Sequence, residues 1–207
     1  MRTALTLLLI LAFSNLKGSN PRYAVSLIPE ELKKNVNAVV REDKMVFTIL
    51  SKSKGTLHVF YAVTIFNDRA NGFAEFVVGY DKLSRITNMN AAVYDGSGKQ
   101  IRKLKNNEII DQAAFGEDAL FSDNRVKIAD LTQGTYPYTV VFEYDKDYNF
   151  LFQIDGSQVL SRENMSVESF SYQLIYPPDL RPRYKAINLE IEPKKEFTPD
   201  GKESLTW

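Results

Sequence analysis

Strict alternation between apolar and polar residues constrains the fold of this chain more than any other feature of its sequence. In residues 136–144, Tyr138, Val140 and Phe142 take every second position, and residues 170–176 repeat the pattern. Successive side chains of a β-strand point to opposite faces of a sheet, so a period of two is typical of a half-buried strand. The sequence therefore predicts strands over 136–144 and 170–176.

Further strand candidates are rich in β-branched and aromatic residues and are separated by turn residues. They cover residues 45–50, 57–66, 73–78, 86–94 and 99–104. A turn at 51–55 joins the first two as a hairpin, and a glycine-rich turn at 95–98 joins the last two. Both faces of 57–66 are apolar, which favours a central strand that is covered on both sides.

Helical signals are confined to the start of the chain. Residues 29–35 begin with proline, carry acids in the first turn and bases in the last, and end at Asn35, which predicts one short helix. Near the other end, residues 187–191 alternate as a strand, and a turn at 198–201 leads into a strand at 204–207.

Many short strands with one short helix indicate an all-β fold. Parallel pairing would need crossover connections that are usually helical, and the sequence offers no pattern for such helices. The expected architecture is an antiparallel two-sheet β-sandwich with one short N-terminal helix. A sandwich of about 200 residues in one domain is ordinary.

The first residues indicate export. Arg2 precedes an apolar run over 4–13 that is too short to span a bilayer, and small residues follow. We interpret 1–19 as a signal peptide, 23–195 as the β-sandwich module and 196–207 as the start of a further, truncated strand. The expected location is periplasmic or cell-surface, without membrane insertion after cleavage. The alternative for the first segment is an N-terminal core strand or helix.

Composition excludes several chemistries. The 26 basic and 26 acidic side chains balance, so no field of one sign attracts nucleic acid. With no Cys and one His, thiolate sites, cysteine nucleophiles and multi-imidazole metal sites cannot form within this chain. We expect no cofactor, no metal site and no catalytic residue.

Polar candidates for chemistry each have a plainer structural interpretation. His58 lies in a strand near a turn, where a hydrogen-bonded structural histidine is the favoured interpretation. Residues 106–124 are expected to form a long loop with a helical turn at 117–121. Its acids could form a carboxylate pair of a hydrolase, but surface polarity is favoured; they are Glu108, Asp111, Glu117, Asp118 and Asp123.

Two further groups follow the strand at 136–144. Asp145, Asp147 and Asp155 could donate oxygens to Ca²⁺, although a solvated turn is the favoured interpretation. Aromatic residues in the less regular segment beyond them could form an exposed recognition surface; they are Tyr148, Phe150 and Phe152.

Several segments together resemble a known family. They are the helix at 29–32 with the sequence 37–41, the hairpin turn at 94–99, residues 121–126 and the strand at 134–144. This order resembles an uncharacterised domain found N-terminal to transglutaminase-like domains in exported bacterial proteins. The resemblance covers residues 23–195 and implies a downstream domain with a Cys-His-Asp triad. Because this chain has no Cys, none of that triad can be assigned to it.

The functional hypothesis is a non-catalytic exported module that positions or recruits partners for a downstream transglutaminase-like domain. The expected partner is that domain or an envelope protein. The alternative is a free-standing carbohydrate-binding or adhesion module of the cell envelope, with polysaccharide as its ligand.

Overall fold

The computed structural model describes residues 21–114, 123–151, 154, 156, 163–185, 187 and 191–207. The predicted signal peptide at 1–19, the helical turn at 117–121 and most of the predicted strand at 187–191 lie outside these residues. Among the described residues, no helix is long and apolar enough to cross a bilayer.

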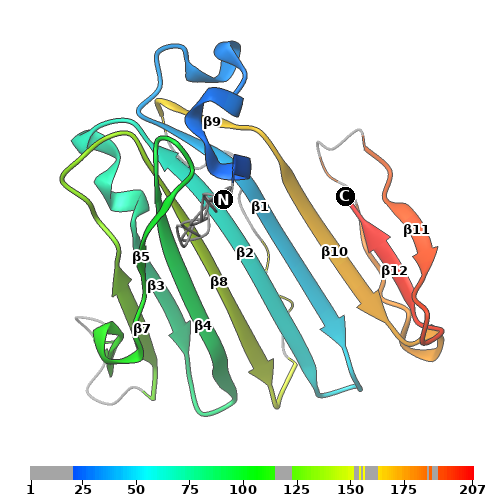
Figure 1. Cartoon of the computed structure of the whole chain (residues 1–207). Coiled ribbons are helices and arrows are strands. Elements are labelled where there is room, and N and C mark those ends of the chain that lie inside the picture. The colour runs from blue at the N-terminus through cyan, green and yellow to red at the C-terminus, as the bar shows by residue number, and fades with distance from the viewer. Residues whose placement is uncertain are drawn as a thin grey trace, which may run out of the picture.

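The chain is mostly β and forms two sheets (Figure 1). The large sheet has nine strands in the order β11-β12-β10-β1-β2-β8-β4-β5, with β9 also paired to β1. Its strands are β1 Ala38–Ile49, β2 Gly55–Ile65, β4 Ser84–Asp95, β5 Gln100–Lys103, β8 Tyr138–Tyr148, β9 Met165–Val167, β10 Phe170–Tyr176, β11 Lys194–Phe197 and β12 Glu203–Thr206. The small sheet has the order β3-β7-β6, with β3 Glu75–Tyr80, β6 Ile110–Ala113 and β7 Arg125–Asp130.

Short 3₁₀ turns connect the strands. They are η1 Pro21–Tyr23, η2 Val25–Leu27, η3 Glu30–Lys33, η4 Asp68–Phe73, η5 Asn106–Glu108 and η6 Pro178–Leu180. The helix predicted at 29–35 is only η3, because the chain leaves helical geometry at Lys34, which is extended, and Asn35 then adopts a left-handed conformation with φ of 58°. Within the predicted loop 106–124, the structure instead contains η5 and the strand β6.

The large sheet is mixed, which corrects the prediction of a purely antiparallel sandwich. Both β9 and β10 run parallel to β1, with Ala38 opposite Met165 and Asp43 opposite Phe170. Between the end of β8 at Tyr148 and the start of β9, the chain has enough residues to return along the sheet. A connection of about a dozen residues meets that need whether or not it is helical.

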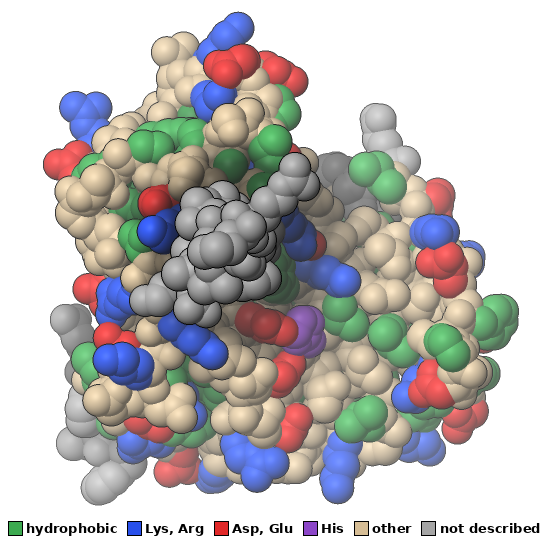
Figure 2. Space-filling model, in the orientation of Figure 1, with side chains coloured by type: hydrophobic (Ala, Val, Ile, Leu, Met, Phe, Trp, Pro, Cys, Tyr) green, Lys and Arg blue, Asp and Glu red, His purple; other side chains and the backbone are tan. Residues whose placement is uncertain are grey.

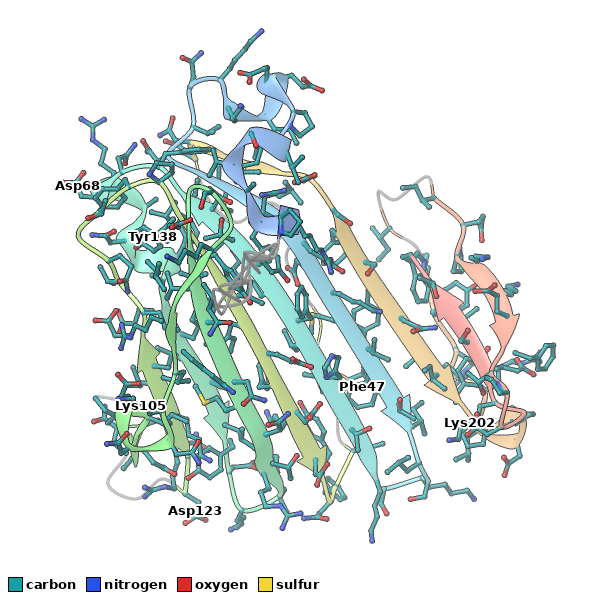
Figure 3. The ribbon with its side chains drawn as sticks, viewed as in Figure 1. Phe47, Asp68, Lys105, Asp123, Tyr138 and Lys202 are labelled. Carbon is teal, nitrogen blue, oxygen red and sulfur yellow. The ribbon has the colours of Figure 1, made fainter. Side chains whose placement is uncertain are left out.

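One face of the large sheet carries the core, which has two parts. The first part fills the space between the sheets, where the ring of Phe76 on β3 stacks on Phe142 with centroids 4.0 Å apart. The second part lies on the same face towards the other end, around Phe47 and Leu57. Tyr138 and Phe47 mark the two parts in Figure 3, and both side chains are fully buried.

Among the described residues, those that cover the opposite face of the large sheet lie at one end of it. There Tyr23 is 5% exposed, and its ring lies 4.6 Å from that of Tyr94. Arg41 holds this N-terminal segment by donating to the carbonyl oxygens of Arg22 and Ala24. The strand β2 is central, as predicted, but covered on both faces only in its second half, because Thr64 is fully buried while His58 is half-buried.

Candidate binding surfaces

A row of side chains, polar except for Val46, crosses the open face of the large sheet. Val46, His58, Asp145 and Asn88 stand opposite one another on β1, β2, β8 and β4. Partners in register point to the same face, so these strands bring together residues that are distant in the sequence. Figure 2 shows the histidine beside acidic side chains on this face.

Hydrogen bonds fix the geometry of this row. His58 Nδ1 lies 2.7 Å from Asp145 Oδ1, and His58 Nε2 lies 3.6 Å from Glu143 Oε1. Asn88 donates to the second carboxylate oxygen of Asp145 at 3.2 Å, and accepts from the side chain of Asn90. Both ring nitrogens of His58 therefore face carboxylates, which is a bridging role and not the geometry of a general base on a nucleophile.

Two of the three acids that were predicted to bind Ca²⁺ or to form a solvated turn belong to a strand instead. Asp145 and Asp147 belong to the strand β8, because the alternation of residues 136–144 continues to Tyr148. Asp147 accepts a hydrogen bond from Arg85 at 3.2 Å, and Asp155 lies outside the described residues. Within the described part of the chain, no group of three or more His, Cys, Asp or Glu side chains is placed to hold a metal ion.

A cleft of about 710 Å³ opens between the ends of the two sheets and contains two of the three predicted recognition aromatics. It is lined by Gly79, Tyr80, Asp81, Leu83, Ser84, Ala114, Asn124, Arg125, Val126, Lys146, Tyr148 and Phe150. Phe150 is 51% exposed. Tyr148 is only 8% exposed, because it continues the inward register of β8 and packs against Phe47. Phe152 lies outside the described residues.

A cluster of hydrogen-bonded side chains stands at one wall of this cleft. Tyr80 donates to both carboxylate oxygens of Asp111 at 2.8 Å, and the Arg125 guanidinium lies 2.8 Å from the same carboxylate. The Tyr80 hydroxyl, followed by Arg125, holds the pKa of Asp111 below its ordinary value. These contacts tie β3, β7 and β6 together.

The other loop acids are also paired within the protein. Glu108 accepts from Arg102 at 3.0 Å and from the backbone of Lys105, and the latter bond is the principal reason why its pKa is lowered. Asp123 lies 2.9 Å from Lys82. Glu117 and Asp118 lie outside the described residues. The described acids of this segment thus have structural partners.

Four exposed hydrophobic side chains lie between residues 184 and 197 of the described chain. We call Tyr184, Ile187, Ile191 and Phe197 the C-terminal apolar residues. Their exposed fractions are 44%, 72%, 64% and 76%, respectively. Phe197 belongs to β11, the edge strand of the large sheet, and Tyr184 packs edge-on against Trp207 at 5.4 Å. Figure 2 shows hydrophobic side chains on this side of the molecule.

A family model fits most of this chain. It is described as a domain of unknown function with solved structure, DUF3857, and it matches residues 39–207. The chain belongs to the DUF3857 family. The resemblance to an uncharacterised domain is therefore confirmed, and the match begins and ends later than the 23–195 inferred from sequence. A comparison of this DUF3857 sequence with curated proteins gave no match.

Solved structures are similar to this DUF3857 chain at low sequence identity. A putative protease from Parabacteroides distasonis is 14% identical with a TM-score of 0.70 over 83% of this chain and 35% of that protein. An aminopeptidase A from Legionella pneumophila is 13% identical with a TM-score of 0.42, over 89% of this chain and 20% of that protein. The chain thus spans about a third of the Parabacteroides protein, and that likeness describes the fold.

Sequence reasoning missed the C-terminal apolar residues as a surface. The alternation of 187–191 predicted a half-buried strand, whereas Ile187 and Ile191 are both mostly exposed. Hydrophobic periodicity indicates that one face of a segment will be covered, but it does not indicate whether the protein's own core or a partner covers it. The same pattern therefore fits a core strand and an interface.

Proposed function

We propose that this chain is a non-catalytic, exported module that positions, or recruits partners for, a transglutaminase-like catalytic domain outside these 207 residues. The observation that carries the proposal is the exposure of the C-terminal apolar residues, above all Phe197 at 76%. Large hydrophobic side chains with such exposure are typical of residues that a partner covers.

The length of a structural relative supports this role, because this chain corresponds to only part of it. The Parabacteroides protein is described as a putative protease, and this chain corresponds to 35% of its length. A fold of this kind can therefore form one part of a longer polypeptide. The arrangement agrees with the resemblance noted in the sequence, in which the domain precedes a catalytic one. A periplasmic or cell-surface location is part of the same proposal.

The proposal is tested with the native gene. The reading frame beyond Trp207 is expressed as a separate polypeptide, and its binding to the 207-residue chain is measured by sedimentation velocity. We expect a complex that the double substitution Ile191→Ser and Phe197→Ser weakens about tenfold or more, because interface energy concentrates in buried hydrophobic anchors. The matched control Ile101→Ser, at an equally apolar exposed position on β5, should bind as the wild type does.

Two outcomes would contradict the proposal. One is a complex that the double variant forms as tightly as the wild type. The other is a stop codon directly after Trp207, which would leave no covalently attached catalytic domain and would put the alternative function first.

The alternative is a free-standing carbohydrate-binding or adhesion module, and the cleft between the sheets favours it. There the rings of Tyr80, Tyr148 and Phe150 lie beside polar side chains such as Asn124 and Arg125. Sugar sites combine aromatic surfaces with a few polar groups. Titration with cell-envelope polysaccharide should then change the intrinsic fluorescence, and Phe150→Ala should abolish that change. An absence of any change would exclude this alternative.

A further inference from the structure

One edge of the strand β4 is only partly occupied. β5 pairs with residues 92–94 of β4, and the Leu104 N–H donates to the Ala91 carbonyl at 2.8 Å. Before Ala91, β4 pairs with β8 on its other edge, and no described residue pairs with the edge that faces away from β8. This leaves a stretch of bare strand in line with β5.

The backbone at Met89 is directed into this open edge. In an antiparallel strand, neighbouring residues direct their N–H and C=O groups to opposite sides, so residues two apart share a side. The Ala91 carbonyl points towards β5, so the backbone N–H and C=O groups of Met89 are directed to the same edge of β4. This regular alternation of the backbone groups ends at the register shift between Ile86 and Asn88.

A groove runs along this edge. It has a volume of about 510 Å³, and residues 86–90 of β4 form one of its walls. The opposite side is formed by Asn106, Ile109, Asp111 and Lys127, which come from η5, β6, β7 and the residue between η5 and β6. The groove is thus as long as a short strand and lies beside the exposed backbone groups of β4.

The β4 residues that line the groove differ in polarity between the two faces of the large sheet. Asn88 and Asn90 belong to the open, polar face of the large sheet, while Ile86 and Met89 are buried on the core face. Ile109 packs against the core cluster between the sheets. A strand lying in the groove would place alternate side chains against amides on one side and, on the other, against Ile109 beside the polar side chains of Asp111 and Lys127.

We propose that this groove binds an extended peptide segment of another protein, which adds to the large sheet as a strand beside β4. The peptide alternates apolar and polar side chains, and its main chain bonds to the backbone at Met89. Strand addition to an exposed sheet edge is a recurring mode of peptide recognition. The part of the peptide that pairs with β4 spans about five residues, opposite residues 86–90, because β5 and Leu104 close one end of the edge.

A second copy of this chain fits the groove less well. Its own β4 extends beyond the bare stretch at both ends, and laid against residues 86–90 it would overlap β5 of the first copy. The site is independent of the C-terminal apolar residues, so this inference stands or fails separately from the proposed function.

The test uses a synthetic octapeptide that alternates valine and threonine, with a control octapeptide of the same sequence that is N-methylated at every residue. N-methylation removes the N–H donors from both edges of the peptide and leaves the side chains unchanged. Hydrogen exchange of the Met89 amide is measured by NMR at about 1 mM peptide. We expect the unmodified peptide to slow that exchange about tenfold or more. The N-methylated peptide should have no effect, and neither peptide should slow exchange at Lys195 on the opposite edge strand.

Variants separate the peptide from other occupants. The double substitution Asn88→Ala and Asn90→Ala, which removes the polar rim, should weaken the peptide's effect on Met89. The proposal is overturned if Met89 exchange does not respond to the peptide, or if both peptides act equally. Protection that instead rises with protein concentration alone would identify a second copy as the occupant and also overturn it.

Discussion

At the scale of single residues, two threonine hydroxyls are buried together at the centre of the large sheet. Thr64 and Thr139 are both fully buried, and their Oγ1 atoms lie 2.8 Å apart on paired strands. Thr139 also donates to the carbonyl of Tyr23 at 3.4 Å, so Thr64 is the donor within the pair. The bond therefore links two central strands and supports the N-terminal segment above them.

Removing the acceptor of this pair should be costly. We expect Thr139→Val to lower the free energy of unfolding by about 1–3 kcal/mol, because the Thr64 hydroxyl then loses its buried partner. The double variant Thr64→Val and Thr139→Val should cost less than the sum of the two single variants. Urea denaturation of all four proteins measures this coupling, and strictly additive losses would show that the hydroxyls do not interact.

Gly55 is required by close packing at the start of β2. A Cβ atom there would lie 2.9 Å from the Phe47 ring and 3.1 Å from the Thr48 carbonyl oxygen. Gly55→Ala should therefore lower the free energy of unfolding by about 1–3 kcal/mol through overpacking. The matched control is Gly79→Ala in β3, where a Cβ meets nothing within 4 Å. Thermal unfolding compares the two, and equal effects would contradict the packing explanation.

Asp111 should give the protein part of its sensitivity to acid. Its pKa is lowered by the Tyr80 hydroxyl and by Arg125. A carboxylate with a depressed pKa contributes stability above the unfolded pKa of about 3.9, and this contribution is lost as the pH falls through the folded value. Between pH 7 and about pH 3, the wild type should therefore lose more stability than Asp111→Asn. Urea unfolding at both pH values measures the difference, and parallel losses would contradict it.

The candidate site could be predicted only in part from single residues. Phe150 was expected to be exposed and is, whereas Tyr148 was expected beside it and is buried. The strand β8 runs further than its alternation suggested, and Tyr148 falls on its inward face. The contacts of His58 with Asp145 could not be predicted, because they depend on the register between β2 and β8, which the sequence pattern does not specify.

At the scale of elements, Arg41 connects the N-terminal segment to the bulge in β1. Its Nε donates to Glu168 at 2.6 Å, its side chain is only 8% exposed, and it also bonds to two carbonyls of residues 22 and 24. The register of β1 and β2 shifts at this position. The bulge thus turns Arg41 towards the segment that covers one end of the open face.

Replacing Arg41 should release this segment. We expect Arg41→Met to lower the free energy of unfolding by about 1–3 kcal/mol and to speed hydrogen exchange at the Val25 amide, which bonds to the Gly96 carbonyl. The control is Arg85→Met, because the ion pair of Arg85 with Asp147 is exposed and should contribute little. Unchanged exchange at Val25 would show that Arg41 does not hold the segment.

Strands and hairpins were predictable, but their order in the sheets was not. The β1–β2 hairpin and the turn at 198–201 were predicted from alternation and turn residues, with Gly201 at φ of 80° in that turn, whereas the strand before this turn was predicted at 187–191 and β11 is Lys194–Phe197. The pairing of β10 with β1 joins residues that are far apart, and no local pattern specifies a parallel partner. The short strand β6 was missed because its four residues lack a clear period.

At the scale of the whole molecule, the described residues bury one face of the large sheet and cover the other face at one end. The small sheet covers the β2–β8–β4 part of the buried face, and the N-terminal segment covers one end of the open face. Exposed apolar side chains lie at the β11 edge, and a bare strand lies at β4 near the opposite edge. The two surfaces that we propose for partners therefore lie on separate parts of the large sheet.

Labelling at a single introduced thiol would test the docking role of the C-terminal apolar residues most directly. The chain has no Cys, so Phe197→Cys and the control Ile101→Cys on β5 each introduce one thiol into it. Their maleimide labelling rates are compared by peptide mass spectrometry in the 207-residue chain and in the protein encoded by the full native reading frame. We expect labelling at position 197 to slow about tenfold or more in the longer protein, while position 101 labels equally in both. Equally fast labelling at position 197 in both proteins would contradict a docked catalytic domain.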